Sequence, residues 1–321
     1  MPAVGRMRGV AFLAGCLAWA AGAPAPAADP PRMQAVPQPY DQVAFEHDGV
    51  EIARYHFGAG LQRPFVFPVV GPSGRCLTRM GHPHDPVGHS HHNSIWFSHM
   101  IVNGMSFWED RSGARIVHRR MEALEDGPDE AAVVCLNAWV GTNGVEVLHE
   151  RRRTCVQALP DGGWMLLIDL QLTAAGADVT FGQTPFGLLG VRMAKSIGVK
   201  DGGGAILNSE GGVNEAGTFR KPARWIDYSG PVAAGVTNGI TILDHPSNPN
   251  HPSVFHTRDD GWMGSCLTFD APRVVTKTAP LRLRYGLHVH AGAPVPAAVE
   301  GRWKTFAATV PFGFKDKPSK R

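Results

Sequence analysis

The chain has 321 residues, of which 43% are hydrophobic and 18% charged, and a formal net charge of +3 at pH 7. This length allows one large core or two small domains, and the scattered lysines and arginines do not indicate a nucleic-acid-binding surface. The sequence contains no HExxH motif, no phosphate-cradling Gly-Lys-Ser/Thr loop and no G-x-S-x-G elbow, which argues against nucleotide binding and serine-hydrolase chemistry.

Residues 1–27 have the features of a signal peptide. Arg6 and Arg8 precede an apolar run over residues 9–21, and residues 25–27 give a small-x-small cleavage pattern before Ala28. A lipoprotein cleavage box that ends at Cys16 is the alternative, although the apolar run before it is short. We therefore expect a periplasmic or secreted protein, and no later apolar run approaches the roughly 18 residues of a spanning helix.

Four cysteines would remain in the mature chain, namely Cys76, Cys135, Cys155 and Cys266. Four cysteines allow three pairings, between which the sequence does not choose. Two disulfides and four buried thiols are both compatible with an oxidising compartment.

Residues 28–42 are rich in proline and are predicted to form an extended linker, followed by a single domain over residues 43–321. Residues 132–140, 164–172 and 281–289 alternate between core-type and outward positions, which predicts half-buried antiparallel strands. One helix is predicted over residues 295–308, where Val299, Trp303 and Phe306 have helical spacing. The predicted fold is all-β: a sandwich of two large antiparallel sheets with a short C-terminal helix.

The first candidate site is the stretch 82–110, because six of the fifteen histidines lie between His82 and His99. In extended backbone His89 and His91 would share one face, and imidazole can bind a divalent metal or transfer protons. Solvated loop histidines that only form hydrogen bonds are the alternative.

Two further stretches could contribute to the same site. In residues 244–252, prolines on both sides of Asn248 fix the backbone that presents His245 from a strand end. In residues 208–215, Glu210 could act as an acid, a base or a metal ligand, and Trp225 follows as a platform for a sugar ring. A simple turn and a solvated glutamate are the structural alternatives.

Two strands carry arginines on one face. Arg282 and Arg284 share a face with His288 and His290, and Arg151 and Arg153 share a face on another strand. These faces predict either a solvated surface or a groove that holds an anionic group.

A family resemblance rests on eight elements in order: GPSGR (71–75), HHNSIWFSH (91–99), VNGMSFWED (102–110), IVHRR (116–120), ERRRT (150–154), LNSEGGVNE (207–215), ARWIDYSGP (223–231) and ILDHPSNPNHP (242–252). The chain resembles a family of bacterial secreted proteins of unknown function, which are often labelled as relatives of a methane-oxygenase subunit. The membrane subunit of that name consists of spanning helices, so the sequence argues against methane oxidation. The family usually has Asp-His-Pro-His-His-Arg where residues 88–93 of this chain are Gly-His-Ser-His-His-Asn. The aspartate and arginine of the family pattern are therefore missing here. If that charged pair takes part in the reaction of the family, we expect the activity or substrate of this protein to differ.

The strand order and size are also similar to the supersandwich of galactose mutarotase-like proteins, which bind or act on carbohydrates. This resemblance implies an exported carbohydrate-active enzyme that uses histidine acid–base chemistry, as an epimerase, lyase or glycoside-cleaving enzyme. A non-catalytic carbohydrate-binding envelope protein and a histidine-ligated metal-dependent oxygenase are the alternatives.

We expect one pocket formed by the His-rich stretch and the 244–252 loop, which binds a carbohydrate or another small polar ligand. The candidate catalytic residues are His91, His92, His245 and Glu210, and a divalent metal, if bound, would be held by His89 and His91. The candidate substrate-binding residues are Arg75, Asn93, Trp96, His99, Asn103, Trp108, Arg153, Trp225, Asn248 and His288.

Overall fold

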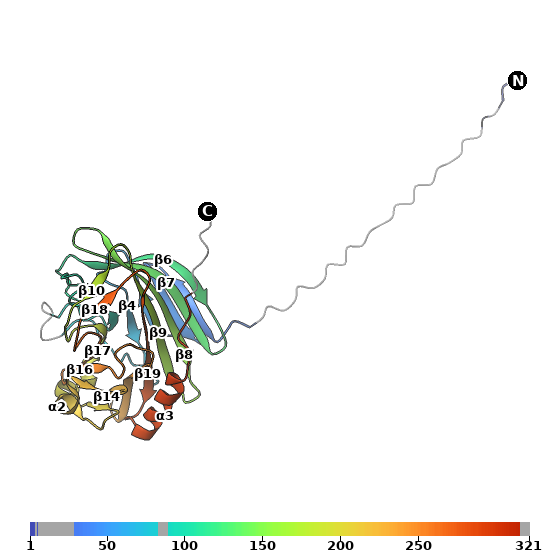
Figure 1. The fold of residues 1–321 in the computed structure, drawn as a ribbon. Helices are drawn as coiled ribbons and strands as arrows, with labels where there is room; N and C mark the ends of the chain where they lie inside the picture. Colours follow the sequence, from blue (N-terminus) through green and yellow to red (C-terminus); the bar gives the residue numbers. More distant parts are fainter. Residues whose placement is uncertain (4, 6–28, 83–88, 315–321) are drawn as a thin grey trace. The chain divides into compact units, whose positions relative to one another are not determined.

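The computed structural model describes residues 1–3, 5, 29–82 and 89–314. Most of the predicted signal peptide, including Cys16 and the cleavage site, lies outside these residues. From Pro31 onward the chain forms one compact unit. Two large antiparallel sheets make up most of this unit (Figure 1).

The first large sheet contains nine strands within the described part of the chain, all paired antiparallel. In spatial order they are β1 (Met33–Gln38), β2 (Gln42–His47), β3 (Val50–His56), β4 (Phe65–Val69), β5 (Ile95–Phe97), β11 (Leu188–Arg192), β17 (Trp262–Cys266), β16 (Val254–Arg258) and β13 (Lys221–Pro222).

The second large sheet has eight strands among the described residues: β12 (Ala205–Asn208), β14 (Trp225–Ala233), β15 (Val236–Asp244), β19 (Leu281–Ala291), β9 (Trp164–Ala174), β8 (Glu146–Ala158), β7 (Glu130–Val140) and β6 (Arg115–Glu125). A small sheet pairs β10 (Val179–Phe181) with β18 (Arg273–Val275). The helical segments are η1 (Lys195–Ile197), α1 (Val199–Gly202), α2 (Asn214–Thr218) and α3 (Pro296–Ala307).

The principal core is formed by the facing sides of the two large sheets. One continuous cluster of buried side chains includes Phe97 and Leu189 from the nine-stranded sheet and Trp139, Ile168 and Leu283 from the eight-stranded sheet. The predicted two-sheet sandwich is therefore confirmed, and α3 confirms the predicted C-terminal helix.

The strands predicted to be half-buried are buried on both faces. In β9 the side chains of Met165 and Leu167 face away from the principal core and form a second cluster with Val299 and Phe306 of α3. The helix covers this part of the outer side of the eight-stranded sheet and removes it from solvent. Local alternation could not reveal this, because the covering helix comes from the C-terminal part of the chain.

The segment predicted to be a linker contains a strand. β1 pairs with β2 along its whole length, and Met33 and Ala35 are buried in the core. Pro37 is tolerated because β1 is an edge strand, where a missing backbone N–H breaks no ladder.

Cys76, Cys135, Cys155 and Cys266 are free thiols, and all but Cys76 are buried. Of the two alternatives, the structure therefore has unpaired thiols. No helix among the described residues is long and apolar enough to cross a membrane.

Candidate functional site: a histidine–tryptophan cavity

The site lies on the outer face of the nine-stranded sheet. The register places Trp96 of β5 opposite Gly190 of β11, and Gly190 opposite Gly264 of β17. Gly264 is in turn opposite His256 of β16. In antiparallel sheets, neighbouring positions along a strand point to opposite faces. Because Leu189 belongs to the core cluster, this row faces outward.

A second row begins two residues farther along the same strands. Trp262 of β17 is paired with Arg192 of β11 on one side and with Arg258 of β16 on the other. A large aromatic ring therefore lies between two cationic side chains.

The two glycines of the first row make room for the tryptophans. A Cβ atom at Gly190 would lie 2.8 Å from ring atoms of both Trp96 and Trp262. At Gly264 it would lie 2.9 Å from the Trp262 ring. Any side chain at either position would displace an indole, so this pattern depends on glycine.

Above these rows is a cavity of about 430 Å³, which we call the histidine–tryptophan cavity. Its volume lies within the range of small-molecule sites, roughly 300–1,000 Å³. The lining residues are His89, His91, His92, Met100, Trp108, Phe186, Arg192, Phe219, Arg220, His256, Arg258, Asp260 and Trp262.

The most distinctive lining residue is His92. Its ring stacks on Trp262 with the centroids 5.2 Å apart and the planes 9° apart, and it also stacks on Trp96 at 5.5 Å. Among the described residues its buried Nδ1 atom has no hydrogen-bond partner. Burial, followed by the nearby His91 and Arg192, lowers the pKa of His92 far below the ordinary value. His92 is therefore neutral near pH 7 and can accept a proton or a hydrogen bond from a ligand.

An ion pair between a buried arginine and a half-buried aspartate forms one wall of the cavity. The Arg192 side chain is fully buried and donates from Nη1 to Oδ1 of Asp260 at 2.9 Å. His82 approaches the other carboxylate oxygen at 3.2 Å, and Arg79 donates to the Asp260 backbone carbonyl. Burial alone would raise the pKa of Asp260, but the hydrogen bond and charge of Arg192 outweigh burial and lower it. Asp260 is therefore an ionised carboxylate, and its negative charge neutralises the positive charge of Arg192.

The opposite wall carries more positive charge. Arg258 pairs with Glu215 at 3.0 Å. Arg220 lies over the ring of Phe219 at 4.9 Å and has no carboxylate partner within the described part of the chain. Its backbone adopts a φ of +55°, which is uncommon for a non-glycine residue and is often found at binding sites. Arg220 is thus the lining cation available to an anionic ligand.

His256 closes the row between Phe186 and Phe219. Its ring contacts both phenyl rings, with centroid distances of 5.0 and 4.9 Å. Burial, and then the charge of Arg220, lowers the pKa of His256 to about 4. Like His92, it is neutral near pH 7.

Arg63 holds the two ends of the His-rich stretch together. Its side chain is only 1% exposed; it donates to the backbone carbonyl of Trp108 at 2.8 Å and to the carboxylate of Asp110 at 2.9 Å. The same guanidinium also donates to the His91 carbonyl at 3.3 Å and to the side chain of Asn93. With a further bond to the carbonyl of Phe107, the two terminal nitrogens of the guanidinium reach five residues. One arginine thus fixes the geometry of the loop.

The structure brings some predicted site residues to this cavity. His89, His91, His92 and Trp108 line it, Trp96 packs beneath His92, and Asn93 is held by Arg63 at its edge. Sequence reasoning did not single out Arg63, Phe186, Arg192, Arg220, Asp260 or Trp262. The sequence signal for Trp262 was the Trp-x-Gly spacing at 262–264, in which a large outward ring precedes a residue with no side chain.

Other predicted residues form contacts elsewhere in the fold. His99 bonds Thr268 at 2.8 Å, Asn103 accepts from the backbone of Thr180 in a turn with positive φ, and the Trp225 indole donates to Glu300. Glu210 is exposed and pairs with Arg224, Arg75 is exposed in a turn, and His288 lines a different cavity.

The structure does not bring His245 and Asn248 to the histidine–tryptophan cavity. The His245 ring bonds the hydroxyl of Ser247 at 2.7 Å and the backbone carbonyl of Thr309 just after α3. Asn248 donates to the buried carboxylate of Asp244 at 2.7 Å. The prediction of one site from both stretches is therefore not met, because internal hydrogen bonds close the 244–252 loop toward α3.

Two of the arginines predicted to line an anion-binding groove are paired with carboxylates instead. Arg284 is buried against Asp169 at 2.7 Å, and Arg153 pairs with Glu130 at 2.9 Å and with Glu125. Each arginine faces a carboxylate on the same or a neighbouring strand, which neutralises its charge. Strand alternation shows that the arginines share a face but not what lies opposite them.

No group of three or more histidine, cysteine, aspartate or glutamate side chains among the described residues is arranged to hold a metal ion. His89 and His91 are 5.9 Å apart between ring centroids.

The chain matches the model of a family of unknown function, DUF6807, over residues 42–304. The protein belongs to this family. The family's description states no activity. No curated protein matches the sequence.

Three solved structures are similar to the chain at low identity. They are a candidate mutarotase (YeaD) from Salmonella typhimurium (11% identity, TM-score 0.34, covering 78% of this chain and 90% of that one), a 4-alpha-glucanotransferase from Thermococcus litoralis (9%, 0.32, 81% and 39%) and the protein HI1317 (7%, 0.25, 81% and 98%). All three TM-scores are low, so the function of this DUF6807 member has to be argued from its own cavity.

Proposed function

We propose that this DUF6807 protein is an exported enzyme that removes a proton from an acidic carbohydrate bound in the histidine–tryptophan cavity. The observation that carries the proposal is His92: a buried, neutral imidazole that stacks on Trp262 and has an unpartnered Nδ1 among the described residues. Export rests on the N-terminal sequence pattern alone.

Aromatic rings next to polar groups support a carbohydrate as the ligand. Trp108, Phe186 and Trp262 line the same cavity as four histidines and three arginines. Rings provide apolar contact for the C–H faces of a sugar, while the polar groups bind its hydroxyls.

The charge of the lining supports an acidic sugar. Asp260 balances Arg192 and Glu215 pairs with Arg258, so the charge of Arg220 remains. A guanidinium can bind a carboxylate through two parallel hydrogen bonds. We therefore propose a uronic acid unit as the substrate, with its carboxylate on Arg220.

The chemistry that fits these groups is proton abstraction next to the carboxylate. The C–H bond breaks, the proton moves to Nδ1 of His92, and the electron pair stays on the sugar as an enolate that Arg220 stabilises. Return of a proton to the opposite face gives epimerisation, whereas expulsion of the β-oxygen substituent gives elimination. The carboxylate also makes His92 a stronger base, because a nearby negative charge favours the imidazolium.

Exchange with deuterated water, together with a search for an unsaturated product, tests this proposal. Epimerisation places a solvent deuteron on the carbon next to the carboxylate, whereas elimination leaves that carbon in a double bond without hydrogen. The protein is incubated in D₂O with oligogalacturonate and with glucuronate-containing oligosaccharides. Mass spectrometry then measures deuterium at the carbon next to the carboxylate and the amount of unsaturated sugar. We expect deuterium incorporation or an unsaturated product with wild type and neither with His92→Gln. The wild-type result is expected with His149→Gln, a matched change at an exposed residue paired with Glu146.

Two outcomes would contradict the proposal. Undiminished exchange or elimination by a folded His92→Gln variant would show that His92 takes no part in the reaction. Binding of these oligosaccharides by the wild type with neither deuterium incorporation nor an unsaturated product would instead identify a non-catalytic binding protein.

A further inference from the structure

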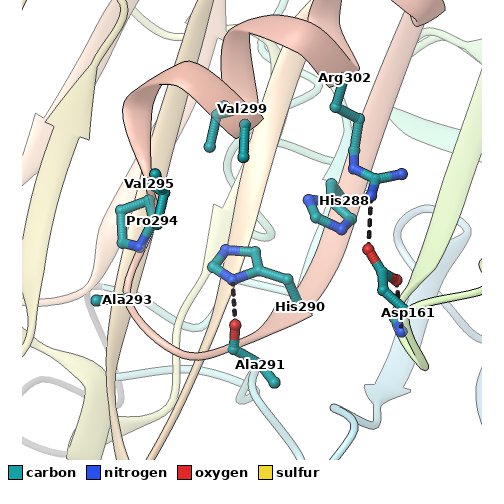
Figure 2. Close-up of a pocket in the computed structure, with 11 residues that line it drawn as sticks. Asp161, His288, His290, Ala291, Ala293, Pro294, Val295, Val299 and Arg302 are labelled. Carbon is teal, nitrogen blue, oxygen red and sulfur yellow. Dashed lines mark hydrogen bonds and ion pairs between the residues drawn. The ribbon is translucent and has the colours of Figure 1, made fainter.

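A second cavity, of about 220 Å³, lies between the end of β19, the turn from β8 to β9, and α3 (Figure 2). It is lined by Asp161, Gly163, His288, His290, Ala291, Ala293, Pro294, Val295, Ala298, Val299 and Arg302. None of these residues lines the histidine–tryptophan cavity. We call it the α3 cavity.

His288 forms the polar centre of the α3 cavity. The residue is only 8% exposed, and neither ring nitrogen has a hydrogen-bond partner within the described part of the chain. Figure 2 shows its ring beneath α3, beside Arg302. A buried polar group without a partner is costly and uncommon in a folded protein. A ligand that supplies the missing partners would remove that cost.

The His288 ring is neutral and can both donate and accept a hydrogen bond. Burial, followed by the charges of Arg302 and His290, lowers the pKa of His288 to about 2. A neutral imidazole has one N–H and one bare nitrogen. A hydroxyl group, which also donates and accepts, complements both.

The charged residues around His288 are already paired. His290 lies 2.7 Å from the buried carboxylate of Asp227, which also accepts from the hydroxyl of Thr241. Burial lowers the pKa of His290, but the hydrogen bond and charge of Asp227 outweigh it and raise the pKa. At the edge of the cavity Arg302 pairs with Asp161 at 2.7 Å. Among the residues that line the α3 cavity, no unpaired charge remains to bind an ionic ligand.

The remaining walls are apolar. Pro294, Val295 and Val299 face the two histidines across the cavity (Figure 2), and Ala298 also lines it. The volume lies below the roughly 300–1,000 Å³ of sites for drug-sized molecules, which suits a ligand no larger than one sugar ring.

We propose that the α3 cavity is a second binding site, which takes a small neutral polyhydroxylated molecule such as a monosaccharide or cyclic polyol, with His288 as its hydrogen-bonding residue. The hydroxyls bind the imidazole, and the C–H face of the ring packs on the valine and proline side chains. This site is independent of the proton-abstraction reaction proposed above.

Nitrogen NMR of ¹⁵N-histidine-labelled protein tests the site directly. The probes are D-glucose, D-xylose and myo-inositol, with D-glucuronate as the charged comparison. We expect the neutral probes to shift the His288 ring signals and glucuronate to have a much smaller effect. Unchanged His288 signals with all three neutral probes would overturn the proposal.

Two variants check the assignment. His288→Leu should bind the neutral probes at least tenfold more weakly without a loss of thermal stability, because leucine buries no unpartnered polar atom. Ala298→Phe should block the cavity from the exposed side of α3, so it provides a second route if His288→Leu does not fold. His149→Leu, at an exposed position, is the control.

Binding that persists in folded His288→Leu and in Ala298→Phe would contradict the assignment. Both variants should keep the deuterium exchange or elimination of the wild type, since neither residue lines the histidine–tryptophan cavity. A failure of this proposal is thus distinguishable from a failure of the proposed reaction.

Discussion

The imidazole of His92 lies nearly parallel to the indole of Trp262, with their planes 9° apart and their centroids separated by 5.2 Å. The two residues are 170 positions apart in the sequence, yet together they form the base of the histidine–tryptophan cavity. Stacking fixes the orientation of the imidazole ring and therefore of its unpartnered Nδ1 atom.

Trp262→Leu is expected to weaken binding of the uronate oligosaccharides by roughly 2- to 12-fold, since aromatic stacking contributes about 0.5–1.5 kcal/mol beyond area burial. Fluorescence titration measures the affinity. The control is Trp303→Leu, which changes a tryptophan of α3 that stacks on His251 outside the cavity. Equal losses in both variants would show that the effect is not specific to the cavity.

Arg63→Met is expected to lower the free energy of unfolding by about 3 kcal/mol or more, because the change leaves buried carbonyl groups and the Asp110 carboxylate without their donor. Urea denaturation measures the loss. In the control Arg119→Met, the arginine is 42% exposed and pairs with Glu146, so a loss below about 1 kcal/mol is expected. A similarly small loss for Arg63→Met would show that this residue does not organise the loop.

Arg220→Gln is expected to weaken binding of a uronate ligand by roughly tenfold or more, because a hydrogen bond to a charged group contributes about 1.5–3 kcal/mol. Affinity for the matching neutral sugar should remain nearly the same. Isothermal titration calorimetry at low and high salt measures both ligands. If the neutral and acidic sugars lose affinity equally, Arg220 does not recognise the carboxylate.

His256 is expected to make folding stability depend on pH. Its folded-state pKa of about 4 lies below the ordinary value of 6.5, so between these values the unfolded chain binds the additional proton. The stability that the neutral His256 ring contributes to the folded state is therefore fully present above pH 6.5 and is lost as the pH falls toward 4.

His256→Gln should reduce the loss of stability between about pH 7 and pH 5 by up to about 2 kcal/mol relative to wild type. His92 and His288, whose pKa values are also lowered, contribute equally in both proteins and cancel in the difference. Urea denaturation over this pH range measures the effect. Parallel pH profiles for the two proteins would contradict the assignment to His256.

The sequence by itself determined the strands, the sandwich and the C-terminal helix. Alternation over 164–172 and 281–289 corresponds to β9 and β19, and the predicted helix at 295–308 corresponds to α3. These features follow from local periodicity, which the order of residues within each segment records. The density of histidine and tryptophan over 82–110 also indicated the loop from which His92 and Trp108 reach the cavity.

Only the tertiary structure decided which distant residues complete each site. The order β5, β11, β17, β16 places Trp96, Arg192, Trp262 and His256 on one face, although their strands lie far apart in the sequence. The same packing directs His245 toward α3, encloses His288 beneath that helix and pairs Arg284 with Asp169. Strand periodicity specifies the face on which a side chain lies; strand order and register, which arise from packing of the whole chain, specify its neighbours.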